Sequence, residues 1–251
     1  MISDPLFYLA AVPAVLLFGI AKGGFGGGLG VAAVPLMALV VSPVQAAGIL
    51  LPLLCLMDLF SLWAYRNHLN IAMQKSLLPG ALIGIAVGTL LFGYLSASAI
   101  RIILGVIAII FTLNHWLGLS AWVADRARRA GRVAAMSSGA LAGFTSFIAH
   151  AGGPPINIYL LTQGLDRTLF VGTTVSFFAV VNYAKLIPYG WLGLLDTGNL
   201  WISLVLAPLA PVGVAIGVWL HRRVSDKLFF QIAYVLLFIV GLRLLYEGLV
   251  G

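Results

Sequence analysis

Charged residues are scarce in this sequence. Only 8% of the 251 residues are Asp, Glu, Lys or Arg, whereas 62% are hydrophobic and the mean hydropathy is +1.10. Soluble domains carry about 25% charged residues, and no stretch here is long and polar enough to form such a domain. The shortage of charge excludes an ordinary soluble protein. It predicts an all-α polytopic membrane protein whose helices satisfy their own backbone groups inside the bilayer.

Cysteine and catalytic motifs are also scarce. The single cysteine, Cys55, lies in an apolar segment, which excludes a disulfide framework and a cysteine metal site. The sequence has no HExxH, CxxC or Walker motif, and the glycines from Gly26 onward lack the strand and ribose-binding acid of a dinucleotide loop. We expect no cofactor, no metal and no enzymatic activity. An intramembrane enzyme with Asp58 and His150 as its acid–base pair is an alternative, but it lacks a nucleophile.

Acidic residues are fewer than basic ones, with 7 Asp and Glu against 14 Lys and Arg. The basic residues lie at the ends of apolar segments, so the positive-inside rule explains them without a nucleic-acid partner. The first ten residues, MISDPLFYLA, have neither a basic region nor a small-residue cleavage site. We therefore expect them to begin a retained first segment and not a signal peptide.

The chain divides into ten apolar segments. They cover residues 5–22, 29–41, 44–66, 76–95, 98–119, 133–149, 154–163, 167–190, 199–221 and 227–249. A helix that spans the bilayer needs about 20 apolar residues, so 29–41 and 154–163 are too short to span unaided. Each of these two follows a glycine-rich turn, and each is predicted to be a half-helix or a re-entrant leg.

The two halves of the chain repeat each other. At an offset of 124 residues, Gly19, Gly28, Gly48 and Tyr65 match Gly143, Gly152, Gly172 and Tyr189, and Asp58 falls on Asn182. At an offset of 129 residues, Leu77, Pro79, Gly84, Ala86, Gly88, Leu91 and Ser96 match identical residues at 206, 208, 213, 215, 217, 220 and 225. We predict a first transmembrane repeat over 1–119, a basic cytoplasmic linker over 120–132 and a second repeat over 133–251.

The charges of the connections predict how the halves are oriented. The connections 66–76, 119–132 and 221–227 are basic, 95–98 carries no charge, and 190–199 carries one acid and no base. The positive-inside rule places the first three in the cytoplasm and the other two outside. Equivalent connections of the two halves then lie on opposite sides. This is an inverted-topology repeat, which is typical of secondary transporters.

Two glycine-rich stretches, 19–35 and 143–161, start the short segments, and six of the eight residues from 23 to 30 are glycine. Free N–H groups and the positive dipole end at the start of a helix attract anions. Close helix packing at glycines is the alternative explanation. The candidate substrate-binding residues are Lys22, Gly24, Gly26, Gly27, Gly28, His150, Gly152, Gly153, Pro154 and Asn157.

Three polar residues are candidates for coupling or for supporting the site: Asp58, Asn182 and Lys185. Asp58 is predicted either to carry a coupling proton or to accept N–H bonds from a glycine-rich loop, whereas its repeat mate Asn182 cannot titrate. Lys185 is a second cation for the substrate, a partner for Asp58, or an anchor at the outer face. Lys22 either neutralises an anion or extends to the headgroups from the end of its helix.

The two motifs GIAKGGFGGGLGVAAVPLMAL and GALAGFTSFIAHAGGPPINIYLL resemble those of the sulfite exporter TauE/SafE family of membrane transporters. The resemblance covers nearly the whole chain. It implies a prokaryotic plasma membrane and a small anionic substrate: sulfite, an organosulfonate such as sulfoacetate, or a related carboxylate. His150 stands where the family often has a small residue, so the exact substrate does not carry over.

Together these features predict a secondary transporter of a small anion that works by alternating access at a glycine-rich site near the membrane midplane. A passive anion channel on the same scaffold, a carboxylate transporter and an accessory subunit without transport of its own are the alternatives. The expected partners are the anion and the lipid bilayer, with no nucleic acid. A homodimer is left open.

Overall fold

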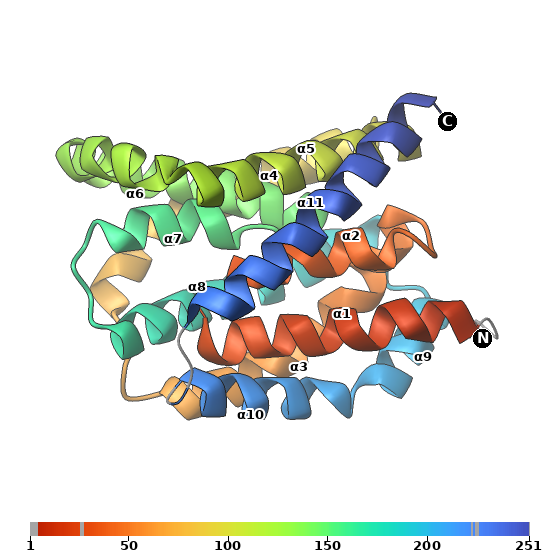
Figure 1. The fold of residues 1–251 in the computed structure, drawn as a ribbon, viewed down its shortest axis with the longest axis horizontal. Helices are drawn as coiled ribbons and strands as arrows, with labels where there is room; N and C mark the ends of the chain where they lie inside the picture. Colours follow the sequence, from red (N-terminus) through yellow and green to blue (C-terminus); the bar gives the residue numbers. More distant parts are fainter. Residues whose placement is uncertain (1–4, 26–27, 222, 224–225, 251) are drawn as a thin grey trace.

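The computed structural model describes residues 5–25, 28–221, 223 and 226–250. Within these ranges the side chains of 28–29, 119–130, 226–230, 232–233 and 236 are not described. The described chain forms helices and no strand (Figure 1). The helices are α1 (Pro5–Gly24), η1 (Gly28–Ala32), α2 (Ala33–Met37), α3 (Pro43–Tyr65), α4 (Ile71–Phe92), α5 (Ala97–Leu117), α6 (Leu119–Ala149), α7 (Gly153–Leu161), α8 (Arg167–Trp191), α9 (Thr197–Leu206), α10 (Leu209–His221) and α11 (Asp226–Val250).

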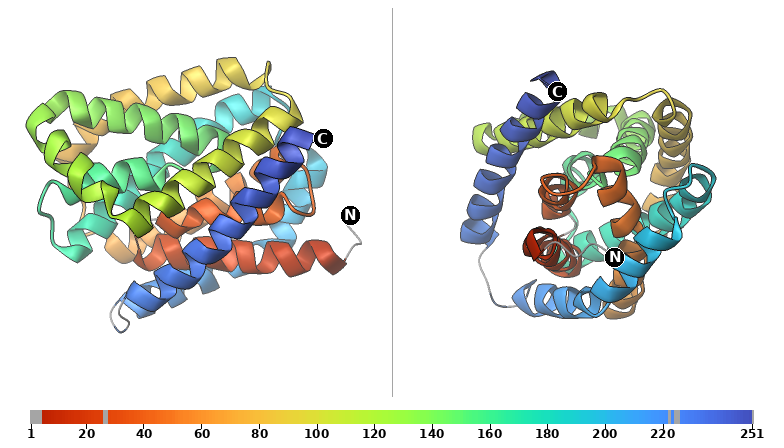
Figure 2. Two further views of the ribbon diagram at one scale, coloured as in Figure 1. Left: turned by 45° about the horizontal axis from the view of Figure 1, so that its top comes forward. Right: turned by 90° about the vertical axis from the view of Figure 1, so that its right-hand side faces the viewer.

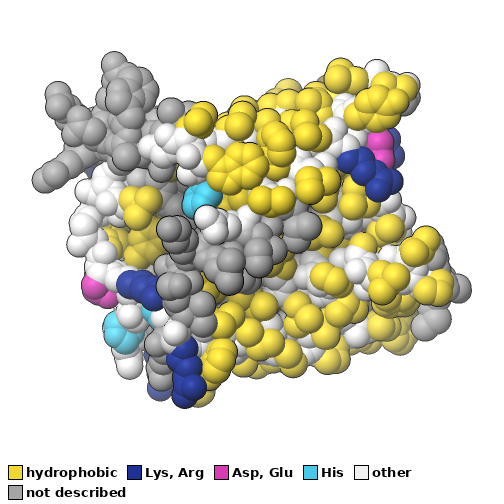
Figure 3. All heavy atoms as spheres, in the orientation of Figure 1, with side chains coloured by type: hydrophobic (Ala, Val, Ile, Leu, Met, Phe, Trp, Pro, Cys, Tyr) yellow, Lys and Arg dark blue, Asp and Glu magenta, His cyan; other side chains and the backbone are white. Residues whose placement is uncertain are grey.

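The all-α polytopic architecture is confirmed. Among the described residues, five helices are long and apolar enough to cross a membrane: α1, α3, α4, α5 and α8. A sixth span is formed by α9 and α10 if their 47° bend lies within one crossing. Figure 3 shows apolar side chains over the middle of the molecule, with most of the charged side chains towards its two ends. This distribution is what a chain surrounded by lipid requires.

The short segments are broken helices, as predicted. The segment 29–41 forms the five-residue helices η1 and α2, and 154–163 forms the nine-residue helix α7. Proline occupies the first turn of α7, where no intrahelical N–H bond is required. The predicted span 199–221 is also broken, between α9 and α10, where Pro208 lacks the N–H that would continue the helix.

The basic segment 120–132 is helical and continues into the second half. Helix α6 covers Leu119–Ala149 with one interruption at Gly131, whose φ of 54° and ψ of −122° lie outside the helical region. Glycine adopts such a backbone without a steric penalty. The second half therefore starts with the part of α6 after Gly131. The three-part division of the chain stays a prediction.

The first long helix of each half packs against a helix of the other half. The partners α4 and α10 occupy equivalent places when the short helices are left out of the count. Helix α1 contacts α10, and α6 contacts α4. These helices approach closely because glycine occupies equivalent positions in the interfaces. A Cβ on Gly19 would lie 2.8 Å from Gly213 Cα, and a Cβ on Gly143 would lie 2.8 Å from Ala81 Cα. Two further large contacts between the halves, α3 with α8 and α5 with α11, join equivalent helices.

One hydrogen bond occurs in both halves at equivalent positions. Tyr65 Oη donates to Gly23 O at 2.7 Å, and Tyr189 Oη donates to Phe147 O at 2.6 Å. Both donors and both acceptors are related by the offset of 124 residues seen in the sequence. The contacts thus follow the internal repeat, while the orientation of the halves in a membrane stays a prediction.

The basic connections lie at one end of the molecule. The ring of Tyr65 at the end of α3 contacts His221 at the end of α10, with ring centroids 5.9 Å apart. At the same end, shown at the left in Figure 1, α8 begins and α5 ends. His115 near the end of α5 stacks on Tyr234 of α11 at 4.0 Å. The arrangement agrees with the charge rule in grouping 66–76 with 221–227. Which face is cytoplasmic stays a prediction.

The glycine-rich end of α1 lies inside the molecule. Figure 2 (right) shows α1 and α2 within a ring of other helices. The last four residues of α1, from Ala21 to Gly24, are all buried. A charged side chain at this place, Lys22, must therefore find its partners within the protein.

Candidate functional site

The two glycine-rich stretches bring a pair of helix ends together. Helix α1 ends at Gly24, and α6 ends at Ala149. His150 then adopts a left-handed backbone (φ 50°, ψ 29°) and donates its N–H to Ser146 O at 3.1 Å, which caps α6. Helix α7 starts at Gly153 and contacts η1. Lys22 and Ser146 are repeat mates, so each glycine-rich stretch presents one polar side chain from its first helix.

Lys22 is 3% exposed and forms a buried ion pair. Its Nζ lies 2.5 Å from Asp58 Oδ1 and 3.2 Å from Leu54 O. Burial excludes the extension to the headgroups that was one possible role of this lysine. An ammonium group has three N–H donors. Two are directed at these oxygens, which leaves one for a ligand.

Asp58 holds the two halves together at the centre of the molecule. Its Oδ2 accepts a hydrogen bond from Asn182 Nδ2 at 2.7 Å, so the repeat mates of α3 and α8 bond to each other. Asp58 is fully buried. Its partners are side chains, and no hydrogen bond from the backbone of a described glycine-rich residue reaches it. Its observed contacts are the ion pair with Lys22 and the hydrogen bond from Asn182, and its role in coupling stays a prediction.

Lys185 is fully buried, and its partners among the described residues are Ser146 and His150. Its Nζ lies 3.0 Å from Ser146 O, 2.9 Å from Ser146 Oγ and 2.8 Å from His150 Nδ1. It is therefore not an anchor at the outer face, and it does not pair with Asp58. The role of a second cation for the substrate stays a prediction.

The partners of His150 determine its tautomer. His150 Nε2 lies 3.0 Å from Ala47 O, a carbonyl that can only accept, so Nε2 carries a proton. In the neutral ring Nδ1 is then the acceptor for Lys185. His150 is thereby tied to α3 through Ala47 and to α8 through Lys185. Its ring also stacks on Tyr189 at 6.0 Å.

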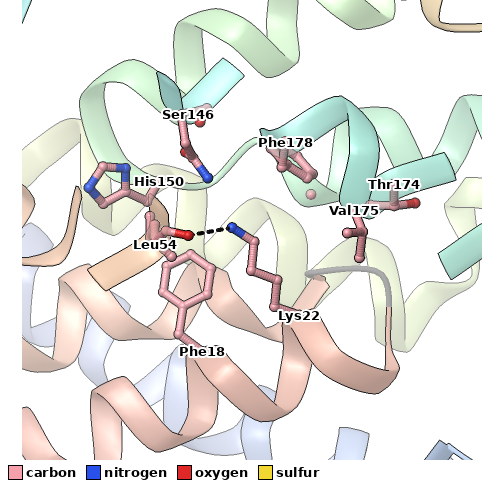
Figure 4. Close-up of a pocket in the computed structure, with 10 residues that line it drawn as sticks. Phe18, Lys22, Leu54, Ser146, His150, Thr174, Val175 and Phe178 are labelled. Atoms are coloured by element: carbon pink, nitrogen blue, oxygen red, sulfur yellow. Dashed lines mark hydrogen bonds between the residues drawn. The ribbon is translucent and has the colours of Figure 1, made fainter. Parts of the chain in front are cut away.

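A small cavity, which we call the Lys22 cavity, lies between these groups (Figure 4). The space open to the centre of a water molecule is about 20 Å³, which is room for about one water. Figure 4 shows Lys22 reaching from α1 towards this space, with Phe18 beside it and Ser146 and His150 opposite. The lining residues are Phe18, Lys22, Leu54, Ser146, His150, Gly153, Thr174, Val175, Phe178 and Asn182.

The cavity is well supplied with hydrogen-bond donors. The N–H groups of Gly152 and Gly153 belong to the start of α7 and have no intrahelical acceptor. The next two residues of α7, Pro154 and Pro155, have no N–H. The positive end of the α7 dipole therefore combines with the lysine ammonium and the serine hydroxyl. This set of groups suits an oxyanion.

Three candidate residues line a second, larger cavity: Gly24, Pro154 and Asn157. This vestibule, as we name it, has about 420 Å³ open to the centre of a water molecule, and Asn114, His115 and Arg167 also line it. It lies at the end of the molecule with the basic connections. Asn157 therefore does not face the Lys22 cavity. Gly26 and Gly27 fall outside the described residues, and Gly28 begins η1.

Sequence reasoning missed several residues of the cavity wall, namely Phe18, Ser146, Thr174 and Phe178. Ser146 could have been found, because it is the repeat mate of Lys22. The same reasoning pairs Lys185 with Ser61, whose buried Oγ has no hydrogen-bond partner among the described residues. The repeat thus exchanges lysine and serine: Lys22 and Ser61 in one half correspond to Ser146 and Lys185 in the other.

Comparison with known proteins gives a family for this arrangement. The family model described as "Sulfite exporter TauE/SafE" matches residues 11–244. Comparisons with curated proteins and with solved structures found no match. The matched region contains both glycine-rich stretches and every described residue of the cavity. The chain belongs to the sulfite exporter TauE/SafE family.

Proposed function

We propose that this protein is a secondary transporter of a small sulfur oxyanion, either sulfite or an organosulfonate such as sulfoacetate, and that the anion binds in the Lys22 cavity. Family membership makes the chain a multi-pass membrane transporter. Substrate, site and mechanism are our proposals. They depend on one observation above all: the buried Lys22 lines the cavity, and so do Ser146 and His150, which contact a second buried lysine, Lys185.

The charge balance supports an anionic substrate. Lys22 and Asp58 neutralise each other, whereas Lys185 has no carboxylate partner among the side chains that the structure describes. A buried charge without a counter-ion costs roughly several kcal/mol even after the protein relaxes. An anion in the adjacent cavity would remove this imbalance. The free N–H of Lys22, the Ser146 hydroxyl and the Gly153 N–H would each donate to one of its oxygens.

The shape of the site supports alternating access. The vestibule ends at Gly24 and Val171, which lie within about one helical turn of the cavity residues Lys22 and Val175. The ring of the buried Tyr189 stacks on His150 of the cavity wall and contacts Phe147, which is also buried. A cavity with room for about one water must widen before an anion fits. A site that must change shape to admit its anion favours a transporter over an open pore.

The repeated contacts support a mechanism in which the parts that move are related by the inverted repeat. Reciprocal packing of α1 on α10 and of α6 on α4 joins each half to the other through equivalent helices. Two such halves can rock about a central site, as in other inverted-repeat transporters. With the orientation predicted from the loop charges, the vestibule opens to the cytoplasm. The proposed location is a prokaryotic plasma membrane.

Counterflow in proteoliposomes tests this function. We expect labelled sulfite on one side to exchange with unlabelled sulfite or sulfoacetate on the other, with saturation. Ser146→Ala removes one donor but no charge and is expected to raise KM about tenfold to a hundredfold, as for a hydrogen bond to a charged group. Lys75→Gln, at an exposed lysine of α4, is the matched control and should change nothing.

Three results would contradict the proposal in different ways. Flux without exchange or saturation would indicate a channel. Exchange of carboxylates but not of sulfur oxyanions would refute the substrate. An unchanged KM in both Ser146→Ala and Lys22→Gln would refute the site.

A further inference from the structure

Lys185 and His150 form a pair of nitrogen groups that holds at most one positive charge. His150 Nε2 must donate to Ala47 O, so its Nδ1 faces Lys185 Nζ at 2.8 Å as the acceptor. Two N–H donors cannot face each other at this distance. An ammonium and an imidazolium therefore exclude each other here. The pair therefore has two forms. In one it holds an extra proton and a single positive charge, and in the other that proton has left and the pair is neutral.

The other ionisable groups around the pair do not balance its charge. Helix α1 contributes Lys22 and α3 contributes Asp58, and these two neutralise each other. Helix α3 also carries the buried thiol of Cys55. On α8, the hydroxyl of Tyr189 donates to Phe147 O and that of Tyr183 faces Cys55 O at 3.4 Å. The described part of α6 that faces the pair adds only Ser146 and His150 itself.

The cavity is where a counter-ion can reach the pair. Both Ser146 and His150, which contact Lys185 directly, line it. An anion in the cavity would lie next to the residues that hold the extra proton. Because the anion stabilises the charged pair, the charged pair must raise the affinity for the anion by the same factor.

We propose that the Lys185–His150 pair binds the coupling proton of this transporter, and that the proton and the anion cross the membrane together in the same direction. This inference rests on the proposed anion transport. The proton enters from water on the side where the anion binds, resides on Lys185 Nζ or His150 Nδ1, and returns to water on the other side with the anion. The pair then reverts to its neutral form, and no bond other than N–H is made or broken. Antiport would require the anion and the proton to exclude each other, which a cationic site does not do.

Methanesulfonate is the probe of choice because the sulfonate of this strong acid stays ionised and carries no proton itself. Proteoliposomes contain a pH-sensitive dye, and the membrane potential is held at zero with potassium and valinomycin. We expect methanesulfonate influx to acidify the interior by about one proton per anion, and an acidic outer medium to drive its accumulation. Flux that moves no proton, or that makes the interior alkaline, overturns the inference while leaving the proposed transport intact. Absence of methanesulfonate flux, with sulfite exchange absent too, refutes the proposed function itself.

Proton uptake on binding tests where the proton resides. Purified wild-type protein in weakly buffered detergent should take up about one proton per bound methanesulfonate at alkaline pH. Lys185→Arg keeps a charge that cannot be released, so the uptake per bound anion should vanish. Lys75→Gln, at the exposed lysine of α4, should retain it. His150→Gln, which keeps Lys185, should shift the pH of half-maximal uptake, and it replaces Lys185→Arg if that variant does not fold. Wild-type uptake and midpoint in Lys185→Arg and His150→Gln would overturn the assignment.

Discussion

The buried ion pair of Lys22 and Asp58 makes a quantitative prediction. The two side chains are 4% and 0% exposed, and their charged atoms lie 2.5 Å apart. Removing one partner leaves the other charge buried without compensation. Such changes cost about 3–5 kcal/mol. Lys22→Met and Asp58→Asn should each lower the stability by this amount.

The double variant should lose much less than the sum of the two single changes, because it leaves neither charge behind. We expect a coupling free energy of at least about 2 kcal/mol between the two positions. With about 2–4 °C per kcal/mol for a chain of this size, each single change should lower Tm by about 6–20 °C.

Thermal unfolding of the purified protein in detergent measures these effects. The matched control is the exposed pair of Arg243 and Glu247, 2.8 Å apart with side chains 58% and 33% exposed. Breaking that pair with Glu247→Gln should change the stability by no more than about 0.5 kcal/mol. The buried pair would be refuted if the single changes at Lys22 and Asp58 lowered the stability as little as the control does. It would also be refuted if their effects simply added in the double variant.

Three further predictions concern the packing of the helices. Tyr65→Phe and Tyr189→Phe should each lower the free energy of unfolding by about 1 kcal/mol, because both remove the same hydrogen bond from equivalent places. Clearly unequal losses in urea or thermal unfolding would contradict this. Gly143→Ala should lower the free energy of unfolding by at least about 1–3 kcal/mol, because the methyl group would lie 2.8 Å from Ala81 Cα. In the same assay Gly93→Ala should raise it by about 0.4–1 kcal/mol, because a methyl group there meets nothing within 4 Å. Cys55 is buried, so the native protein should resist a maleimide that labels it promptly after unfolding, and prompt labelling of the native state would show that α3 is placed wrongly.

Most of the helices could be predicted from the sequence because the signal for a spanning helix is local. About 20 apolar residues with few charges are sufficient, and the predicted segments agree with α1, α3, α4, α5 and α8. The segment 120–132 was predicted to be a linker, but it is helical, and the reason is physical. Its four arginines indicated a connection exposed to water, yet arginine and alanine are strong helix formers. The chain stays helical there until Gly131 interrupts it.

The site could be predicted only in part. Sequence reasoning selected Lys22, Asp58, His150, Asn182 and Lys185, and the structure brings all five together. It could not tell which lysine meets Asp58, because that depends on how each helix is rotated about its own axis. Spacing along the chain does not fix this rotation.

Asn157 lies elsewhere than the sequence suggested. It lies on the short helix α7 next to the glycine-rich turn, which made it a candidate donor to the anion. In the structure it faces the vestibule instead. It lies four residues after Gly153, so a full turn of helix already carries it away from the cavity.

A structure of the protein with selenite tests the central claim most directly. Selenite has the charge and shape of sulfite, and its selenium can be located by anomalous scattering. The account predicts an anomalous peak within hydrogen-bond reach of Lys22 Nζ, Ser146 Oγ and Gly153 N, in a cavity wider than the present one. A peak found only in the vestibule, with the Lys22 cavity still closed, would contradict it.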